Sequence, residues 1–551
     1  MRTVFAASAR ATTARGGRWS GTGRSALALV LGGLPVFAFP TPDLWWWAYV
    51  CLVPLLLLIR TAPTARRAGY DGWCGGTGFM LAVHHWLLPS LNVFLVVLAV
   101  LFGLLWLPWG RLVRAMLGGI PSPRRAGAAL VLIPSGWLMI ELVRSWQGLG
   151  GPWGLLGASQ WEVPAALRLA SVGGVWLLSG LVVAVNTALA LLVAAWSRVR
   201  RGARSRHAAL AGLAGLLGCV LLLGLAPWAV PAPRTTGKVV RIGVVQAGLL
   251  GGAVGAARRF DRGEELTRTL AGQRLDLVVW GESSVGADLR TRPDLAARVA
   301  ALSREVGAPV LVNVDARRSD RPGIYKSAVL VGPGGPTGQR YDKMRLVPFG
   351  EYIPLRPLLG WATSVGKAAE VNRRRGTAPV VMTLPPGAGG TGAPGLRIGP
   401  LICFETAFPD MSRHLADMGA QVIVAQSATS TFQDSWAPAQ HASLGALRAA
   451  ETGRPMVHAT LTGISAAYAP DGRRTGPVLG TDRSATAVYT LPLSDTRTGY
   501  DRLGPWPVYA AGLALLVAGA VGAAGRFRTS GRGPRAPRTR TARGSAGRPG
   551  H

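Results

Sequence analysis

The sequence predicts a multispan α-helical membrane domain, followed by an α/β domain and one further span. Of the 551 residues, 49% are hydrophobic and the mean hydropathy is +0.29, which is too apolar for an ordinary soluble enzyme of this length. The apolar residues concentrate in 25–231 and 506–525, whereas 238–495 has the mixed composition of a globular domain. The arginines fall in the terminal segments and in short gaps between apolar runs. Together these observations favour a membrane protein with one large non-membrane domain.

Eight apolar runs are long enough to be spans, because a bilayer core about 30 Å thick requires roughly 20 apolar residues per helix. We expect seven spans before the α/β domain and one after it, at residues 25–40, 44–59, 70–88, 92–110, 128–145, 168–196, 208–230 and 506–525. A cleaved signal peptide is the alternative for the first run. The six apolar runs that follow it disfavour that alternative.

The net charge of +34 could suggest a nucleic-acid-binding protein, because basic patches attract phosphate. The distribution of the charge argues against this. Residues 1–24 contain five arginines and no acidic residue, and residues 526–551 contain eight arginines and no acidic residue. Further arginine clusters lie in alternate gaps between spans, which is the positive-inside pattern. We therefore expect both basic tails in the cytoplasm, residues 238–495 on the extracytoplasmic side of the cell membrane, and no nucleic-acid partner.

Residues 238–495 alternate short runs rich in Val and Ile with helix-like stretches, which indicates an α/β domain whose catalytic groups gather at strand ends. Gly/Pro-rich stretches at 332–338 and 385–395 are expected to be loops, and 470–477 a hairpin turn. We expect strands at 239–247, 275–283, 309–316, 327–333, 396–404 and 421–427, and helices at 256–271, 291–306, 409–419 and 438–452.

Two ionisable residues fall within the fifth expected span. Glu141 and Arg144 are three apart, hence on one helical face and able to pair. Ionisable groups in a membrane segment indicate function by default. An interfacial salt bridge at the outer end of the span is the alternative, and both readings stay open.

Of the four cysteines, only Cys403 lies outside an expected span. It ends an apolar strand and is followed two residues later by Glu405. A strand end of this kind can expose a nucleophilic thiol beside polar groups that ionise it. A buried and inert packing cysteine is the alternative. The other three cysteines offer no disulfide framework, and we expect neither a metal nor a cofactor.

Two more strand ends of this domain carry reactive residue types, Glu282 in LVVWGESS and Lys343 in RYDKMRLVPFGEY. A glutamate can accept the thiol proton of Cys403. A lysine cation can favour the thiolate and stabilise the oxyanion that forms when the thiolate attacks a carbonyl. The three residue types therefore form a coherent set for acyl transfer.

These three residues match the Glu–Lys–Cys triad of the nitrilase, or carbon–nitrogen hydrolase, superfamily. With the spans in front of it, the chain resembles a divergent apolipoprotein N-acyltransferase of bacterial membranes, from about residue 25 to residue 525. The resemblance implies an α-β-β-α sandwich for residues 238–495. The motifs that carry it are LVPFGEYIP at 346–354, ICFE at 402–405, GRPMVHAT at 453–460 and GPWGLLGASQ at 151–160.

The resemblance also implies a role for each site residue. Glu282 would be the general base, Lys343 the electrostatic stabiliser and Cys403 the nucleophile, with Glu351 and Glu405 in support. In the family's reaction, the thiolate takes an acyl chain from a phospholipid as a thioester. The N-terminal amine of a diacylglyceryl-cysteine lipoprotein then attacks this thioester, so phospholipid and lipoproteins are the implied partners.

Several positions depart from the family pattern. Gly281 replaces a proline, Phe404 stands where a tyrosine is usual, and Phe260 takes the place of an expected tryptophan. The usual Ser-Asn-Asp and Asn-Asn-Gly loops read Ser-Ala-Thr at 427–429 and Leu-Thr-Gly at 461–463. The altered loops support one alternative, a weakly active or inactive paralogue that binds lipoproteins. A second alternative is a membrane-anchored amidase of the same superfamily, which the multispan region disfavours.

One apolar loop has a separate expectation. Residues 355–365, LRPLLGWATSV, could dip into the lipid as a substrate-gating arm, or could simply cover a core.

Overall fold

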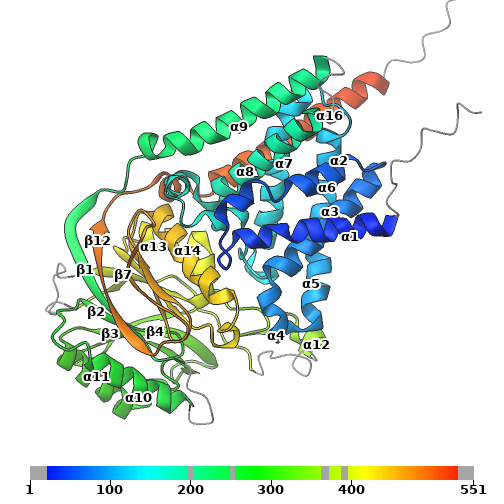
Figure 1. The fold of residues 1–551 in the computed structure, drawn as a ribbon. Helices are drawn as coiled ribbons and strands as arrows, with labels where there is room; N and C mark the ends of the chain where they lie inside the picture. The colour runs from blue at the N-terminus through cyan, green and yellow to red at the C-terminus, as the bar shows by residue number, and fades with distance from the viewer. Residues whose placement is uncertain (1–20, 197–202, 249–254, 361–370, 386–394, 531–551) are drawn as a thin grey trace, which may run out of the picture.

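The computed structural model describes residues 21–196, 203–248, 255–360, 371–385 and 395–530. Figure 1 shows a group of helices on one side and a domain of two sheets with flanking helices on the other. The helices belong to the N-terminal part of the chain, joined by α16 (Trp506–Ser530) from the C-terminal end. This arrangement confirms the predicted fold class.

The N-terminal part is entirely helical within the described residues. The last helix, α16, packs against α7 and α8 and so returns to the group. The helices are α1 (Gly21–Gly33), α2 (Val53–Arg60), α3 (Ala65–Val83), α4 (Leu88–Leu91), α5 (Val93–Gly103), α6 (Trp106–Leu117), α7 (Pro123–Arg144), α8 (Pro164–Trp196) and α9 (Ala203–Ala229), with 3₁₀ turns at Leu34–Ala38, Trp45–Tyr49, His85–Leu87, Gln147–Leu149 and Leu156–Gln160.

Five helical stretches of the described residues are long and apolar enough to cross a membrane, or six if the bent pair α5 and α6 is one span. That pair bends by 42° where a single straight span was expected over 92–110. The run at 44–59 forms a short apolar helical stretch instead of a full-length helix. The total of eight spans, and the domain limits drawn from it, stay predictions.

The run expected as a span at 70–88 is helical as α3, which begins earlier and ends earlier, but α3 is not among the stretches apolar enough to cross a membrane. Thr64 caps it by accepting a hydrogen bond from the backbone N–H of Arg67 at 3.1 Å. The first turns of α3 contain charged residues that are paired. The buried carboxylate of Asp71 lies 2.7 Å from the guanidinium of Arg24 and 2.8 Å from that of Arg67. A Cβ on Gly32 of α1 would lie 1.9 Å from the carbonyl oxygen of Gly75, so the two helices touch backbone to backbone.

The second part contains two six-stranded mixed sheets, with strand orders β12-β1-β2-β3-β4-β5 and β11-β10-β9-β8-β7-β6. In each sheet three neighbouring strands run parallel in part: β1, β2 and β3 in the first, β7, β8 and β9 in the second. The strands are β1 (Thr235–Gln246), β2 (Leu277–Trp280), β3 (Val310–Arg317), β4 (Ile324–Gly332), β5 (Gly335–Asp342), β6 (Met382–Thr383), β7 (Arg397–Ile402), β8 (Val422–Ser427), β9 (Met456–Thr460), β10 (Ser465–Tyr468), β11 (Arg474–Leu479) and β12 (Ala485–Ser494).

The helices of this part lie on the outer faces of the two sheets (Figure 1). Alternate strand residues face opposite ways: Val244 joins the core between the sheets, and Val245 joins a second core under α10 and α11. On the other sheet, α13 contacts β7, and α14 contacts β9 and β10. The result is the expected α-β-β-α sandwich. Its helices are α10 (Gly255–Arg268), α11 (Pro293–Val306), α12 (Arg356–Leu359), α13 (Pro409–Asp417), α14 (Ala437–Thr452) and α15 (Gly499–Leu503).

All six expected strands and four expected helices of this domain are present, with small shifts at their ends. The hairpin turn expected at 470–477 is confirmed in part, because the turn joins β10 and β11 but residues 474–477 already belong to β11. The loop expected at 332–338 is wrong in part, because residues 335–338 begin β5 and pair with β4. For the loop expected at 385–395, residues 386–394 lie outside the described part of the chain.

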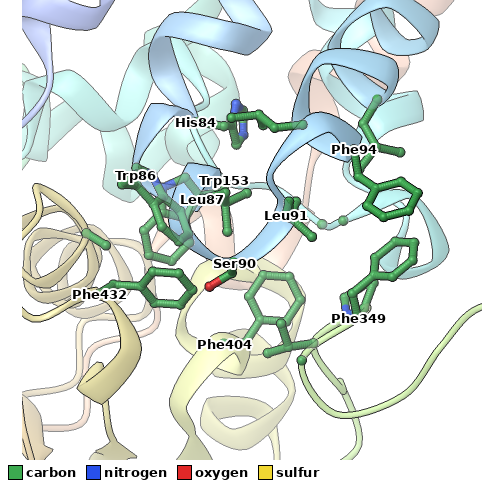
Figure 2. Close-up of a pocket in the computed structure, with 18 of the residues that line it drawn as sticks. His84, Trp86, Leu87, Ser90, Leu91, Phe94, Trp153, Phe349, Phe404 and Phe432 are labelled. Atoms are coloured by element: carbon green, nitrogen blue, oxygen red, sulfur yellow. The ribbon is translucent and has the colours of Figure 1, made fainter. Parts of the chain in front are cut away.

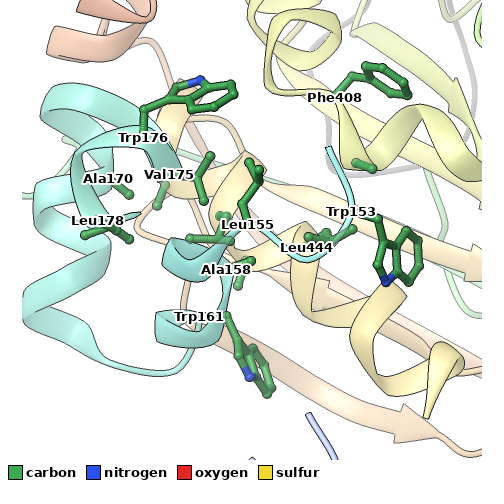
Figure 3. Close-up of a cluster of buried hydrophobic side chains, with 14 of the residues drawn as sticks. Trp153, Leu155, Ala158, Trp161, Ala170, Val175, Trp176, Leu178, Phe408 and Leu444 are labelled. Atoms are coloured by element: carbon green, nitrogen blue, oxygen red, sulfur yellow. The ribbon is translucent and has the colours of Figure 1, made fainter. Parts of the chain in front are cut away.

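Helix α14 is the main bridge between the two parts. Its Glu451 side chain accepts a hydrogen bond at 2.8 Å from the backbone N–H of Val175. That N–H is freed where α8 kinks at Gly174, which has φ +67°. Figure 3 shows the apolar contact next to this bond, where Leu155 and Trp176 of the membrane part lie near Leu444 of α14. The α/β domain is therefore held to the membrane helices by both apolar packing and a buried hydrogen bond.

Candidate active site

A pocket of about 330 Å³ lies between the membrane helices and the α/β domain. Most of its lining is apolar, with aromatic side chains from both parts arranged around it (Figure 2). The membrane part contributes residues of α3, α4 and α5, and the α/β domain contributes the turn at 347–350 and Cys403. The one cysteine predicted to be reactive therefore opens into an apolar space shared by both parts.

Cys403 lies where β7 ends and a 3₁₀ turn begins, and its φ is +53°. Few non-glycine residues adopt this conformation, which costs of order 1–3 kcal/mol and clusters at functional sites. His441 of α14 holds the turn, with its Nε2 3.0 Å from the carbonyl oxygen of Cys403. The thiol lies 3.9 Å from the carbonyl oxygen of Ala428. The geometry is that of a thiol presented by a strained strand-to-turn junction.

Lys343 joins the two predicted carboxylates. Its Nζ lies 3.0 Å from Oε1 of Glu282 and 2.7 Å from Oε1 of Glu351. Glu282 follows β2, and Lys343 follows β5 of the same sheet. Glu351 also accepts a hydrogen bond from the backbone N–H of Val347, so it holds both the lysine and the turn that lines the pocket. The structure brings these three residues together.

Sequence reasoning missed a second lysine in this cluster. Lys326 of β4 places its Nζ 2.9 Å from Glu282, 3.2 Å from Glu351 and 3.8 Å from Asp315. It lies beside Lys343 because the backbone N–H of Lys343 donates to the carbonyl of Lys326 at the β4–β5 edge. The signal in the sequence was a lysine within an otherwise apolar strand, IYKSAVLV, although only the strand register shows what it faces.

Glu405 supports the site by hydrogen bonds to neighbouring segments, and it does not contact Lys326 or Lys343. It is fully buried and accepts hydrogen bonds from the hydroxyl of Tyr341 and from the backbone N–H groups of Met344, Arg345 and Ile402, at 2.7 to 3.0 Å. It thereby ties the segment after Lys343 to the end of β7. Phe404 lines the pocket and packs edge-on against Phe408, with ring centroids 5.0 Å apart.

The charges of the cluster fix its resting protonation. Burial raises the pKa of the Cys403 thiol to about 12, Glu282 adds to this, and Lys343 opposes it. Burial alone would raise the pKa of Glu282, but Lys326 and Lys343 outweigh it and hold that pKa well below its usual value. Burial alone would lower the pKa of Lys343, but Glu282 and Glu351 outweigh it and raise that pKa. At neutral pH the site therefore holds a thiol, carboxylates and ammonium groups.

Comparison with known proteins identifies the family of this chain. The model of the carbon-nitrogen hydrolase family matches residues 241–499, and the model of the apolipoprotein N-acyltransferase N-terminal domain matches residues 31–188. A protein of Azotobacter vinelandii named apolipoprotein N-acyltransferase is 32% identical over 517 residues, covering 90% of this chain and 93% of that protein. This chain belongs to the apolipoprotein N-acyltransferase family.

A second relative and a solved structure are also similar to this chain. A Pseudomonas aeruginosa protein named apolipoprotein N-acyltransferase is 30% identical over 514 residues, covering 89% of this chain and 93% of that protein. Among solved structures, an amidase from Nesterenkonia sp. is 19% identical with a TM-score of 0.34, covering 50% of this chain and 96% of the amidase.

The two altered loops of this apolipoprotein N-acyltransferase family member still support the site through their backbones. The carbonyl of Ser427 accepts hydrogen bonds from the N–H groups of Glu282 and Leu461, at 3.1 and 2.8 Å. The N–H of Thr429 donates to the carbonyl of Thr462 at 2.9 Å. The loops at 427–429 and 461–463 are thus hydrogen-bonded to each other, and the first loop is also hydrogen-bonded to the backbone of Glu282.

The glycine at position 281 is explained by a close backbone contact. A Cβ at this position would lie 1.8 Å from the backbone nitrogen of Leu461. The residue before Glu282 therefore has no side chain because the 461–463 loop packs directly onto it. Phe260 packs edge-on against Trp280 at 5.4 Å, inside the core under α10 and α11 and away from the pocket.

Glu141 and Arg144 bind the following loop instead of each other. Glu141 accepts hydrogen bonds from the indole of Trp137 and the N–H of Leu156, at 2.9 and 2.8 Å. Arg144 donates to the carbonyls of Trp153 and Gly154, each at 2.6 Å, and also lines the pocket. The interfacial salt bridge is not formed, and the pair instead shapes the loop that joins the membrane part to the site.

The expected gating arm at 355–365 is described only up to residue 360. Leu355 is 70% exposed and begins the short helix α12, and Pro354 beside it lines the pocket. Residues 361–365 lie outside the described part of the chain, so the arm stays a prediction.

No group of three or more metal-ligating side chains occurs within the described ranges.

Proposed function

We propose that this chain is an apolipoprotein N-acyltransferase that carries the acyl group on Cys403. The donor is a phospholipid, and the acceptor is the N-terminal amine of a diacylglyceryl-cysteine lipoprotein. One observation carries the proposal: the thiol lies within electrostatic influence of the paired Glu282 and Lys343 and lines an apolar pocket that the membrane helices share. A hydrolase of small polar amides has no use for such a pocket.

In the first half-reaction, the sulfur of Cys403 attacks an ester carbonyl of the phospholipid. Glu282 accepts the thiol proton as the carbon–sulfur bond forms, because a thiol with a pKa of about 12 is not ionised beforehand. The negative charge moves to the carbonyl oxygen, where the Lys343 ammonium stabilises it. The carbon–oxygen bond then breaks, and the leaving glycerol oxygen takes the proton from Glu282.

In the second half-reaction, the lipoprotein amine attacks the thioester carbonyl. Glu282 accepts a proton from the amine, the carbon–nitrogen bond forms, and the carbon–sulfur bond breaks. The Cys403 sulfur leaves as a thiolate and regains its proton from Glu282. This two-step cycle requires the same base, cation and nucleophile twice, which the single cluster supplies.

The proposed orientation across the membrane is supported by α7, which is 22 residues and so about 33 Å long. Arg124 and Arg125 lie at its start, and Arg144 at its end lines the pocket. The basic start favours the cytoplasm, which supports an extracytoplasmic site and cytoplasmic termini. Both lipid substrates would then reach the thiol from the outer leaflet.

One experiment separates this proposal from its alternatives. The purified protein is incubated with phospholipid vesicles and a diacylated lipopeptide, and the products of wild type and Cys403→Ala are compared by mass spectrometry. N-acylated lipopeptide that vanishes in the variant is the expected result. Free fatty acid without N-acylation would indicate the membrane-anchored amidase, and lipopeptide binding without any product would indicate the inactive paralogue.

A further inference from the structure

Three hydrogen-bond donors of the pocket lining have no partner in the described structure: the Nε–H of Arg144 and two neutral groups on one connection. The indole Nε1 of Trp86 and the hydroxyl of Ser90 are both buried, and neither reaches an acceptor. Both residues line the pocket that contains Cys403, and both lie on the short connection between α3 and α5. In the view of Figure 2, the Ser90 hydroxyl points from this connection toward Phe404 and Phe432 of the α/β domain.

Unmet donors at such a position are unfavourable in the empty protein. A buried donor without an acceptor costs about 1–3 kcal/mol, and most buried polar groups are satisfied. The rings around these two donors offer no acceptor: Trp86 packs against Trp153 and Phe432, with centroids 5.0 and 4.9 Å away. An acceptor that enters the pocket with a substrate would satisfy both donors.

The chemistry of the pocket selects a neutral acceptor. Its lining includes one cation, Arg144, and both terminal nitrogens of that guanidinium already donate to backbone carbonyls. Of the Arg144 nitrogens, only Nε has no partner among the described residues, so a phosphate would find a single unpaired guanidinium nitrogen in a mostly apolar lining. An ester carbonyl oxygen is uncharged and has two lone pairs that can accept hydrogen bonds. It also lies between apolar acyl and glycerol groups, which fit the apolar lining of the pocket.

We propose that Trp86 and Ser90 form a subsite for an ester carbonyl of a diacylglycerol group, on a chain that is not being transferred. This inference rests on the proposed function. The reacting carbonyl lies at Cys403 and Lys343, so a second ester of the same lipid needs its own donors. Both the phospholipid donor and the diacylglyceryl acceptor carry such an ester, and the subsite would hold the glycerol in register with the thiol.

The test measures single-turnover thioester formation on Cys403 by intact-protein mass spectrometry, without acceptor. Vesicles contain either a diester phospholipid or analogues in which one of the two ester links is an ether, in both positional isomers. We expect wild type to react about 10-fold faster with the diester than with the reactive ether analogue, since one lost hydrogen bond is worth about 1.4 kcal/mol. The Trp86→Phe and Ser90→Ala double variant should react with both lipids at similar rates.

A second arm starts from the preformed thioester and compares a diacyl lipopeptide with its dialkyl ether analogue as acceptor. An ether effect that the double variant abolishes in either arm supports the subsite and shows which lipid occupies it. Trp73→Phe is the matched control, because its indole donates to the carbonyl of Val100 away from the pocket. This control should keep the wild-type ratio.

Three results would overturn the subsite. Equal rates with ester and ether lipids in wild type, in both arms, would mean that the donors hold a water only. An equal slowing of the double variant on both lipids would mean a structural role. Absence of a thioester from every lipid in wild type would instead overturn the proposed function, and the subsite with it.

Discussion

Lys326 and Lys343 donate to the same carboxylate oxygen of Glu282, at 2.9 and 3.0 Å. Glu282 is therefore held between two ammonium groups, and Glu351 bonds to both of them. The carboxylates of Glu282 and Glu351 offset the repulsion between the two lysines in this buried space. This arrangement explains why the pKa of Glu282 falls although burial alone would raise it.

Replacing Lys326 by methionine should move the acidic limb of activity to higher pH. The lysine lowers the pKa of Glu282, so its removal raises that pKa and protonates the base at a higher pH. We expect a shift of about one pH unit or more in the profile of thioester formation. Lys326→Arg keeps the charge and should leave the acidic limb where it is in wild type. An unmoved acidic limb in Lys326→Met would contradict the effect of Lys326 on the pKa of Glu282.

The same cluster should make folding stability depend on pH. Because the pKa of Glu282 is lowered in the folded protein, its contribution to stability is present above the unfolded value, near 4.5, and is lost as the pH falls toward the folded value. Glu282→Gln should flatten the stability profile over this acidic range and slow thioester formation about 100-fold or more. Thermal unfolding measured from pH 3 to pH 7 and single-turnover rates check the two effects separately.

His441 should act as a positioning residue for Cys403. Its Nε2 lies 3.0 Å from the Cys403 carbonyl, and burial lowers its pKa to about 4, so the ring is neutral across the working pH range. His441→Ala should slow both half-reactions by about 10-fold, since a hydrogen bond to the strained turn is lost. The pH profile should keep its shape above about pH 5. A lost or displaced limb in that range would show instead that His441 itself transfers protons.

Gly281→Ala should destabilise the α/β domain. The new methyl group would lie 1.8 Å from the nitrogen of Leu461, so the backbone of the 461–463 loop must move. Overpacking of this kind costs about 1–3 kcal/mol and should lower the melting temperature of the detergent-solubilised protein by several degrees. Gly334→Ala is the control, because a Cβ there meets nothing within 4 Å. Equal melting temperatures for the two variants would contradict the close contact.

Two of the three predicted site residues could be placed because each follows a strand recognisable from its own residues: Glu282 and Cys403 come after apolar runs, and strand ends meet at one edge of an α/β fold. Lys343 follows the polar strand β5, whose first residues were expected to be a loop, so only its motif indicated it. Lys326 could not be predicted in this way. It lies inside a strand, and only the β4–β5 register turns it toward Glu282.

The membrane part was predictable in outline and less so in detail. Hydropathy located the long helices α7, α8 and α9, but not the bend between α5 and α6, which tertiary packing decides. Arg66 and Arg67 at the start of α3 were left out of the expected span, because the sequence does not show that Arg67 pairs with the buried Asp71. The same limit hid the pocket, whose lining comes from segments as far apart as Trp86 and His441.

The most direct test of the account is the mass of the intact protein after incubation with phospholipid vesicles, without an acceptor. The account predicts an added acyl group that maps to Cys403, is released by hydroxylamine, and disappears when a diacylated lipopeptide is added and becomes N-acylated. Acylation at another residue, or N-acylated lipopeptide formed by Cys403→Ala, would contradict it.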